Sequence, residues 1–250
     1  MLLHPLLEQL GQLRLKGMVH ALETQLQQPD ITSLSFEERL SLLVQHEITV
    51  RENQRLDNRL RNAKLKQAAC VENIDYKERR GLDKSLMLKL ATGHWIKEHH
   101  NLLLTGPTGT GKSYISCALA HKACLENYSA RYVRIPRLFQ ELSVAKHDGR
   151  YTKLMTDFAK TDLLILDDWG LAPLTDEQRR DLLELLDDRH HLRSTIVTSQ
   201  LPISLWHEII GDNTLADAIL DRLVHNAYKI NLTGGSMRKK SALICQEEGK

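Results

Sequence analysis

Cysteines and metal-binding patterns are scarce in this sequence. The cysteines form no CxxC pair, so we expect no zinc site, only reduced thiols buried as small apolar groups: Cys70, Cys117, Cys124 and Cys245. Two histidine pairs, at residues 99–100 and 190–191, lack neighbouring cysteines or carboxylates at metal-ligand spacing. We expect both pairs on the surface of helices rather than in a metal centre.

Long apolar runs and an excess of one charge are also absent. No run approaches the roughly 18 apolar residues of a membrane span, and the first residues lack the pattern of a secretory signal, so we expect a cytoplasmic protein with no membrane contact. The 34 Lys and Arg against 32 Asp and Glu give a net charge of +2. This balance excludes a uniformly basic nucleic-acid-binding protein, so any DNA-binding surface must be local.

Helical patterns dominate the first part of the chain. Leu, Glu, Gln and Arg recur at helical spacing over residues 1–70, with a break at Gln27–Asp30. Ser35 followed by Glu38 predicts a capping box opening a helix that either continues to Ala69 or restarts near Val50. Residues 83–99 form another helical stretch. We predict an α-helical N-terminal module, residues 1–70, followed by a larger second domain, residues 71–250.

Short apolar runs alternate with amphipathic helices beyond residue 100. This alternation is typical of βαβ units and predicts an α/β fold with a five-stranded parallel sheet. We expect the strands near residues 101–105, 131–135, 162–166, 194–199 and 228–232.

A complete GxxxxGK[ST] motif lies between the first predicted strand and a helix. Glycines let the loop turn its N–H groups inward toward phosphate oxygens, and the helix N-terminus adds a positive dipole end. The lysine reaches the β- and γ-phosphates and the serine offers a hydroxyl to Mg²⁺. A glycine turn without a ligand is the disfavoured alternative. The motif predicts nucleoside triphosphate binding by Gly106, Pro107, Thr108, Gly109, Thr110, Gly111, Lys112 and Ser113.

Two carboxylates end the third predicted strand. The apolar run 163–166 followed by Asp167 and Asp168 has the form of a Walker B strand, in which Asp167 holds Mg²⁺ and Asp168 orients the attacking water. The alternative is that both acids only cap the following turn. Another predicted strand ends in the polar residues Thr198-Ser199-Gln200, one of which could bind the γ-phosphate or the attacking water. The alternative is an ordinary strand end that leads into a loop.

Together these motifs resemble the AAA+ superfamily, and most closely the IstB-like ATPases of insertion sequences, relatives of DnaC-type helicase loaders and of DnaA. The matching stretches are GPTGTGKS at 106–113, LLILDD at 163–168, TSQ at 198–200 and ILDRL at 219–223. The resemblance implies an AAA+ P-loop core that uses ATP and Mg²⁺. It also implies a transposition helper that binds double-stranded DNA, forms a homo-oligomer and recruits or stimulates a partner transposase.

Several site residues follow only from this resemblance. It implies that Arg222 acts as a finger on the neighbouring subunit's nucleotide, whereas the sequence alone favours a plain salt bridge. Ser199 falls at the sensor position. Ile74 and Tyr76 fit the adenine-side segment, with packing of the linker as the alternative, and Tyr114 follows the phosphate loop as a further nucleotide contact.

The chain also departs from the superfamily pattern. Asp168 stands where glutamate is usual and Ser199 where asparagine is usual, which puts the rate of hydrolysis in doubt more than nucleotide binding. Few residues follow the last predicted strand, so we expect no separate lid domain. Arg238 either replaces a lid arginine or belongs to a solvated tail.

A basic stripe offers a local DNA-binding surface. If one helix spans residues 51–66, Arg51, Arg55, Arg59 and Lys66 fall within an arc of about 80°, opposite apolar positions. The alternative is an ordinary solvated face. Residues 238–240 form a smaller basic cluster. Without interleaved aromatic residues, contact with a duplex backbone fits better than stacking on single strands.

Four functions remain open. A transposition helper is favoured, and a helicase loader sharing the same motor is the nearest alternative. A small-molecule P-loop kinase predicts a dedicated acceptor pocket and no stimulation by DNA. A nucleotide-gated scaffold with little turnover is kept open by Asp168.

Overall fold

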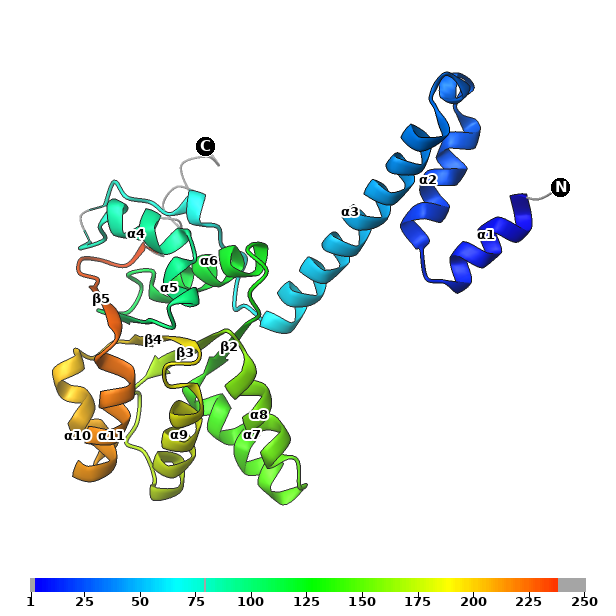
Figure 1. The fold of residues 1–250 in the computed structure, drawn as a ribbon. Coiled ribbons are helices and arrows are strands. Elements are labelled where there is room, and N and C mark those ends of the chain that lie inside the picture. Colours follow the sequence, from blue (N-terminus) through cyan, green and yellow to red (C-terminus); the bar gives the residue numbers. More distant parts are fainter. Residues whose placement is uncertain (1–2, 79, 238–250) are drawn as a thin grey trace, which may run out of the picture. The chain divides into compact units, whose positions relative to one another are not determined.

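The computed structural model describes residues 3–78 and 80–237 (Figure 1). The chain divides into two compact units, Met1–Asn58 and Arg59–Lys250, which we describe separately. The basic cluster 238–240, with Arg238, and Cys245 lie outside the described residues. No helix in the described part is both long and apolar enough to cross a membrane.

The first unit is entirely helical where it is described. It contains α1 (Leu3–Gln12), α2 (Lys16–Gln27), the 3₁₀ turn η1 (Pro29–Ser33) and the start of α3 (Phe36–Ala63). The expected capping box is present, because the Ser35 N–H donates to Glu38 (2.7 Å) and the Glu38 N–H donates to the Ser35 hydroxyl (3.2 Å). Helix α3 passes Val50 without a break and ends at Ala63, so neither expected form of this helix was right.

A buried carboxylate joins α2 to α3. Glu47 is 7% exposed, accepts the backbone N–H of Met18 (3.1 Å) and pairs with Arg51 (2.6 Å). A Cβ at Gly17 would lie 2.7 Å from the Glu47 Cα, so only glycine allows this approach. Burial alone would raise the pKa of Glu47, but Arg51 and the backbone N–H groups of Met18 and Gly17 lower it below its ordinary value.

We expect Glu47→Gln to loosen the packing of α2 on α3 by about 1–2 kcal/mol at pH 7, because hydrogen bonds to a charged acceptor are lost at a helix N-terminus. The pKa of Glu47 is lower in the folded state than its ordinary value of 4.5. The stability that the Glu47 carboxylate contributes is therefore complete above pH 4.5 and is lost as the pH falls through the lowered pKa. Amide hydrogen exchange in α2, compared at pH 7 and in acid, measures how much Glu47 stabilises the packing of α2 on α3. The exposed Glu52→Gln on the same helix is the control, and equal protection in both variants would contradict the expectation.

The second unit is built on a five-stranded parallel sheet. All five expected strands are confirmed. Two lie at their expected bounds, two are shifted by one residue at both ends, and β3 starts one residue later and ends three residues later than expected: β1 (Asn101–Thr105), β2 (Ala130–Arg134), β3 (Leu163–Trp169), β4 (Ser194–Ser199) and β5 (Ala227–Asn231). The order is β2-β3-β4-β1-β5, so the strand before the phosphate loop lies between β4 and β5. The carboxyl ends of all strands therefore meet at one edge.

Helices cover both faces of this sheet (Figure 1). On one side lie α4 (Lys84–Ala91), α5 (His94–Lys97) and α6 (Lys112–Leu125), and on the other α7 (Ile135–His147), α8 (Tyr151–Lys160), α9 (Asp176–Arg189), α10 (Trp206–Ile210) and α11 (Asn213–Val224). Short 3₁₀ turns are η2 (Val71–Asn73) and η3 (Ile203–Leu205). The described residues after β5 end at Met237, so the expected absence of a separate lid domain stays a prediction.

Two local expectations were wrong. The helical stretch 83–99 is two helices, because Gly93 adopts a left-handed conformation (φ +72°) that ends α4 and starts α5. Cys117 and Cys124 are buried as expected, and burial raises the pKa of both thiols, but Cys70 is only half-buried. The reason is its place in an extended linker just before η2 rather than in the sheet.

Candidate nucleotide-binding site

The phosphate loop connects the end of β1 to the start of α6. Gly106, Gly109 and Gly111 have backbone φ values of +135°, +84° and +97°, which residues with a Cβ rarely adopt. A Cβ at Gly106 would lie 2.0 Å from the Leu232 carbonyl oxygen. The loop therefore needs glycine at these positions, and its conformation is set by the sequence motif.

Lys112 lies inside this loop. Its ammonium group donates to the carbonyl oxygens of Gly106 (2.5 Å) and Pro107 (2.7 Å), and the residue is 9% exposed. Thr110 is fully buried, and its hydroxyl also donates to Pro107 (2.9 Å). The lysine charge is thus held where the loop would surround phosphate oxygens.

Asp167 is the centre of a hydrogen-bond cluster. Ser113 donates to both of its oxygens (2.9 and 3.0 Å), Thr198 and Tyr132 donate one bond each, and the ammonium group of Lys66 lies 3.2 Å from Oδ2. Burial alone would raise the pKa of Asp167, but the bonds from Thr198 and Tyr132, the charge of Lys66 and the Ser113 hydroxyl lower it. The carboxylate is therefore ionised at neutral pH.

This donor set fits Mg²⁺. The ion prefers oxygen ligands, keeps several waters and binds through one or two carboxylates together with phosphate oxygens. A carboxylate and a hydroxyl in contact beside a phosphate loop, Asp167 and Ser113, provide the protein share of such a shell. Among the described residues, no group of three or more His, Cys, Asp or Glu side chains that could hold a metal ion occurs.

Asp168 points into the same cavity from a distorted strand end. It has a left-handed φ of +65°, and the β3–β4 register shifts between Leu166 and Trp169 at this point. The Asp168 carboxylate pairs with the Arg134 Nε (2.6 Å) and its N–H donates to the Thr198 hydroxyl (3.3 Å). Arg134 was not identified from the sequence, although it ends the strand paired with β3 and its register partner is Asp167.

These residues converge on one cavity of about 620 Å³. Phosphate-loop residues and both carboxylates line it together with Tyr114, Lys66 and Gln200, and a segment before α4 closes it with Asn73, Asp75, Glu78 and Arg80. Buried Arg80 donates to the carbonyl oxygens of Thr110 and Asp75 (both 2.8 Å), which ties that segment to the loop. A cavity of this size and polarity suits a nucleotide.

Within the phosphate loop, Gly106, Pro107 and Thr110 do not line this cavity, and outside the loop Ile74, Tyr76 and Ser199 do not line it either. Ile74 is 5% exposed and packs in the core, as in the linker-packing alternative, and Tyr76 is half-buried outside the cavity; their neighbours Asn73 and Asp75 line it instead. Ser199 is 1% exposed because its hydroxyl donates to the Trp169 carbonyl (2.9 Å) and accepts the Leu201 N–H (3.1 Å). Ser199 does not line the cavity, whereas Gln200 does, so Gln200 is the better-placed sensor candidate.

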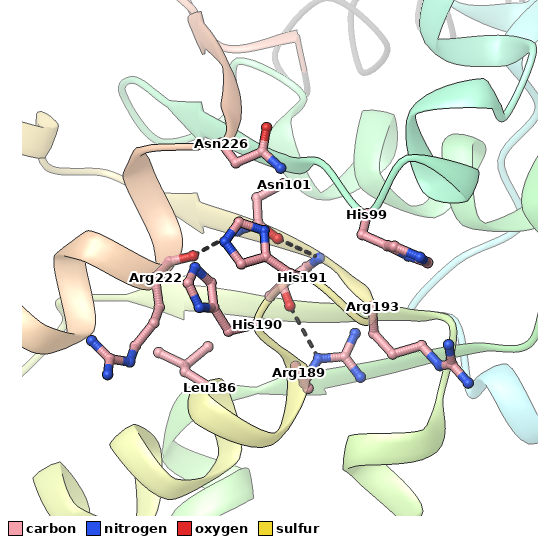
Figure 2. Close-up of a pocket in the computed structure, with 10 residues that line it drawn as sticks. His99, Asn101, Leu186, Arg189, His190, His191, Arg193, Arg222 and Asn226 are labelled. Carbon is pink, nitrogen blue, oxygen red and sulfur yellow. Dashed lines mark hydrogen bonds between the residues drawn. The ribbon is translucent and has the colours of Figure 1, made fainter.

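Arg222 lies at the other end of the sheet. Asn101, the first residue of β1, donates to the Arg222 carbonyl (2.9 Å), whereas the phosphate loop follows the last residue of β1 (Figure 2). Five strand residues span about 16 Å, so Arg222 cannot reach the cavity of its own chain. Its guanidinium group donates to Asp187 and to the Ala218 carbonyl (2.9 Å), which is the salt bridge that the sequence alone favoured.

Both histidine pairs lie near Arg222 and not on helices. His99 and His100 follow α5, while His190 and His191 follow α9 with ring centroids 3.9 Å apart. Together with Arg193, three of these histidines, His99, His190 and His191, line a small basic pocket beside Arg222 (Figure 2). The expectation of surface helix residues was wrong because α5 and α9 end just before the pairs.

The basic stripe is only partly as expected. Lys66 follows the end of α3, so the helical arc does not include it, and it contacts Asp167. Arg51 pairs with Glu47, and the Arg59 Nε donates to the Cys124 carbonyl (3.0 Å), so both have structural contacts. Arg55 is exposed.

A second basic hollow, which the sequence did not reveal, lies between α7 and α8. It measures about 650 Å³ and its lining includes five cationic side chains and two acidic ones: Lys64, Arg131, Arg137, Arg150, Lys153, Glu141 and Asp157. Several of these cations already have partners; Arg137 pairs with Glu141 (3.1 Å) and Arg131 lies over the Phe158 ring. The hollow is a second candidate for phosphate contact.

Known proteins share both the sequence and the fold. A putative insertion sequence ATP-binding protein, y4pL of Sinorhizobium fredii, is 51% identical over 239 residues, which make up 96% of this chain and 98% of that protein. The structure resembles that of DnaI (TM-score 0.58, 24% identity, 71% of this chain and 94% of that chain) and that of the DnaC helicase loader (TM-score 0.55, 19% identity, 66% and 96%). The profile of the IstB-like ATP binding proteins matches residues 8–244, and the chain belongs to that family.

Proposed function

We propose that this protein is a cytoplasmic ATPase of an insertion sequence, which assembles with copies of itself on double-stranded DNA and recruits or stimulates a partner transposase. One observation carries the proposal. The phosphate loop, the Asp167–Ser113 pair and Asp168 share one cavity, whereas Arg222 lies at the opposite end of the sheet. A site that needs an arginine from another subunit couples ATP use to assembly.

The chemistry follows from the positions of the side chains. The loop N–H groups and Lys112 would hold the phosphates, and Ser113 and Asp167 would hold Mg²⁺, which would neutralise charge on the phosphate oxygens. Asp168 accepts a hydrogen bond from the attacking water and orients it, while Arg134 fixes the direction of that carboxylate. Gln200 lines the cavity and is the candidate to sense the γ-phosphate.

Relatives favour transposition over helicase loading. The 51% identical protein is described as a putative insertion sequence ATP-binding protein, whereas the helicase loader DnaC shares the fold at 19% identity. The adjacent reading frame discriminates between the two: an integrase-like transposase supports the proposal, and a replication gene supports a loader. Stimulation of that transposase by this protein, measured as strand transfer with and without ATP, tests the partner directly.

Assembly on DNA is the main test of the proposal. We expect a large complex, seen by light scattering after size-exclusion chromatography, with duplex DNA and ATP together, and smaller species with ADP or without DNA. Full ATP turnover by a strict monomer under all conditions would contradict it. A small-molecule kinase would show no response to DNA.

Variants separate the two candidate DNA surfaces. Arg55→Gln is expected to reduce the slope of log affinity against log salt by about 0.9, because one phosphate contact is lost. The matched comparison is Lys153→Gln in the hollow between α7 and α8. If only Lys153→Gln changes the slope, the stripe on α3 is the wrong surface and the hollow replaces it.

A further inference from the structure

Lys66 occupies an unusual place for a residue outside the Walker motifs. It lies in the segment 64–70 that joins α3 to η2, and its ammonium group is 3.2 Å from Asp167 Oδ2. The Lys66 side chain is 37% exposed and lines the nucleotide cavity, whereas that of Asp167 is 1% exposed. A partly exposed cation from a linker therefore reaches the buried carboxylate that would bind Mg²⁺.

The Asp167 carboxylate has no spare acceptor capacity in this arrangement. A carboxylate offers about four lone-pair directions. Four donors face it: the single Ser113 hydroxyl hydrogen, which lies close to both oxygens, the Thr198 and Tyr132 hydroxyls, and the Lys66 ammonium group. Thr198 and Tyr132 are fixed on the neighbouring strands β4 and β2, so the contact that can give way to a metal ion with least rearrangement is the one from the exposed lysine.

The linker around Lys66 is fixed at both ends. Ala63 is fully buried and Ala69 is 5% exposed. Between them, Lys64 has a left-handed φ of +48°, which turns the chain at the end of α3. If Lys66 moves, the backbone can therefore rearrange only in the short segment between Ala63 and Ala69.

We propose that Lys66 is an internal counter-cation of Asp167 that competes with Mg²⁺, so that loading Mg²⁺–ATP releases Lys66 and loosens residues 64–68. Two cations on one carboxylate repel each other, and a lysine on a long flexible stem leaves more easily than a chelated ion. The competition multiplies the intrinsic Mg²⁺ affinity by the fraction of molecules in which Lys66 is disengaged from Asp167, so the apparent affinity is lower. This inference rests on the proposed function only in requiring that the site binds Mg²⁺–ATP.

The test measures binding of a fluorescent ATP analogue to the full chain across a range of free Mg²⁺. Lys66→Gln is expected to lower the Mg²⁺ concentration for half-maximal binding by about fivefold, a change that the loss of one partly exposed ion pair can account for. The affinity for the analogue without Mg²⁺ should change little. Lys97→Gln is the matched control, because Lys97 is an exposed lysine that lines neither the nucleotide cavity nor the α7–α8 hollow. Lys66→Arg keeps the cation and should retain the native midpoint.

Hydrogen exchange gives a second readout that does not depend on turnover. In the native chain, amides 64–68 should exchange faster with Mg²⁺–ATP than with ATP and a chelator, and Lys66→Gln should exchange fast in both. An unchanged Mg²⁺ midpoint in Lys66→Gln would overturn the inference. An equal loss of nucleotide affinity with and without Mg²⁺ would also overturn it, because Lys66 would then be a phosphate ligand. If the native chain binds no ATP at all, the proposed function fails and the inference fails with it.

Discussion

Replacing Lys112 with alanine is expected to weaken ATP binding at least 100-fold and to reduce turnover to background. Two hydrogen bonds from an ammonium group to phosphate oxygens contribute about 1.5–3 kcal/mol each, and the Gly106 and Pro107 carbonyls hold the Lys112 ammonium group within the loop. Titration calorimetry with ATP measures the affinity, and phosphate release measures the turnover.

Lys122→Ala on the same helix is the control for that experiment. Lys122 pairs with Glu126 (2.7 Å) on the surface of α6, and such pairs contribute little to stability. Its affinity for ATP should match that of the native chain. Because Lys112 also stabilises the loop, the melting temperature of Lys112→Ala must be recorded, and ATP affinity within threefold of native in a folded variant would refute the assignment of Lys112 to the phosphates.

The elements that could be predicted are those with a simple local cause. Strands β1 and β4 were predicted at their observed bounds because each is a buried run ended by turn residues. The phosphate loop was predicted because its glycines are needed for backbone conformations that other residues rarely adopt. The end of α3 was not, since nothing in the charge pattern marks Ala63 as the last helical residue, and Lys66 was therefore placed on a helix it does not belong to.

The cluster around Asp167 needed the strand order before it could be seen. Tyr132 lies on β2 and Thr198 on β4, the two neighbours of β3, so both reach Asp167 only once the order β2-β3-β4 is known. The choice between Ser199 and Gln200 had the same difficulty. Successive strand residues point to opposite faces, so a shift of one position decides which side chain meets the phosphates, and the sequence alone does not set that register.

Arg222→Ala is expected to lower ATP turnover by about 10³-fold while leaving ATP binding nearly native, because an arginine finger stabilises charge that develops on the γ-phosphate. The loss should be repaired in trans. Lys112→Ala subunits keep Arg222, and Arg222→Ala subunits keep an intact phosphate loop, so mixing the two inactive variants creates complete sites. With random head-to-tail assembly, an equal mixture should recover about one quarter of native turnover per chain.

The salt bridge to Asp187 makes a structural role for Arg222 the main competing explanation, and Asp187→Ala separates the two. This variant removes the intramolecular partner of the guanidinium group but keeps the arginine itself. If Arg222 acts on a neighbour, Asp187→Ala should retain turnover, because the arginine is then released to reach the other subunit. If Arg222 only joins α11 to α9, Asp187→Ala should be as impaired as Arg222→Ala, and mixing should restore nothing. The opposite outcomes decide whether the site is completed between subunits, which is the premise of ATP-dependent assembly on DNA.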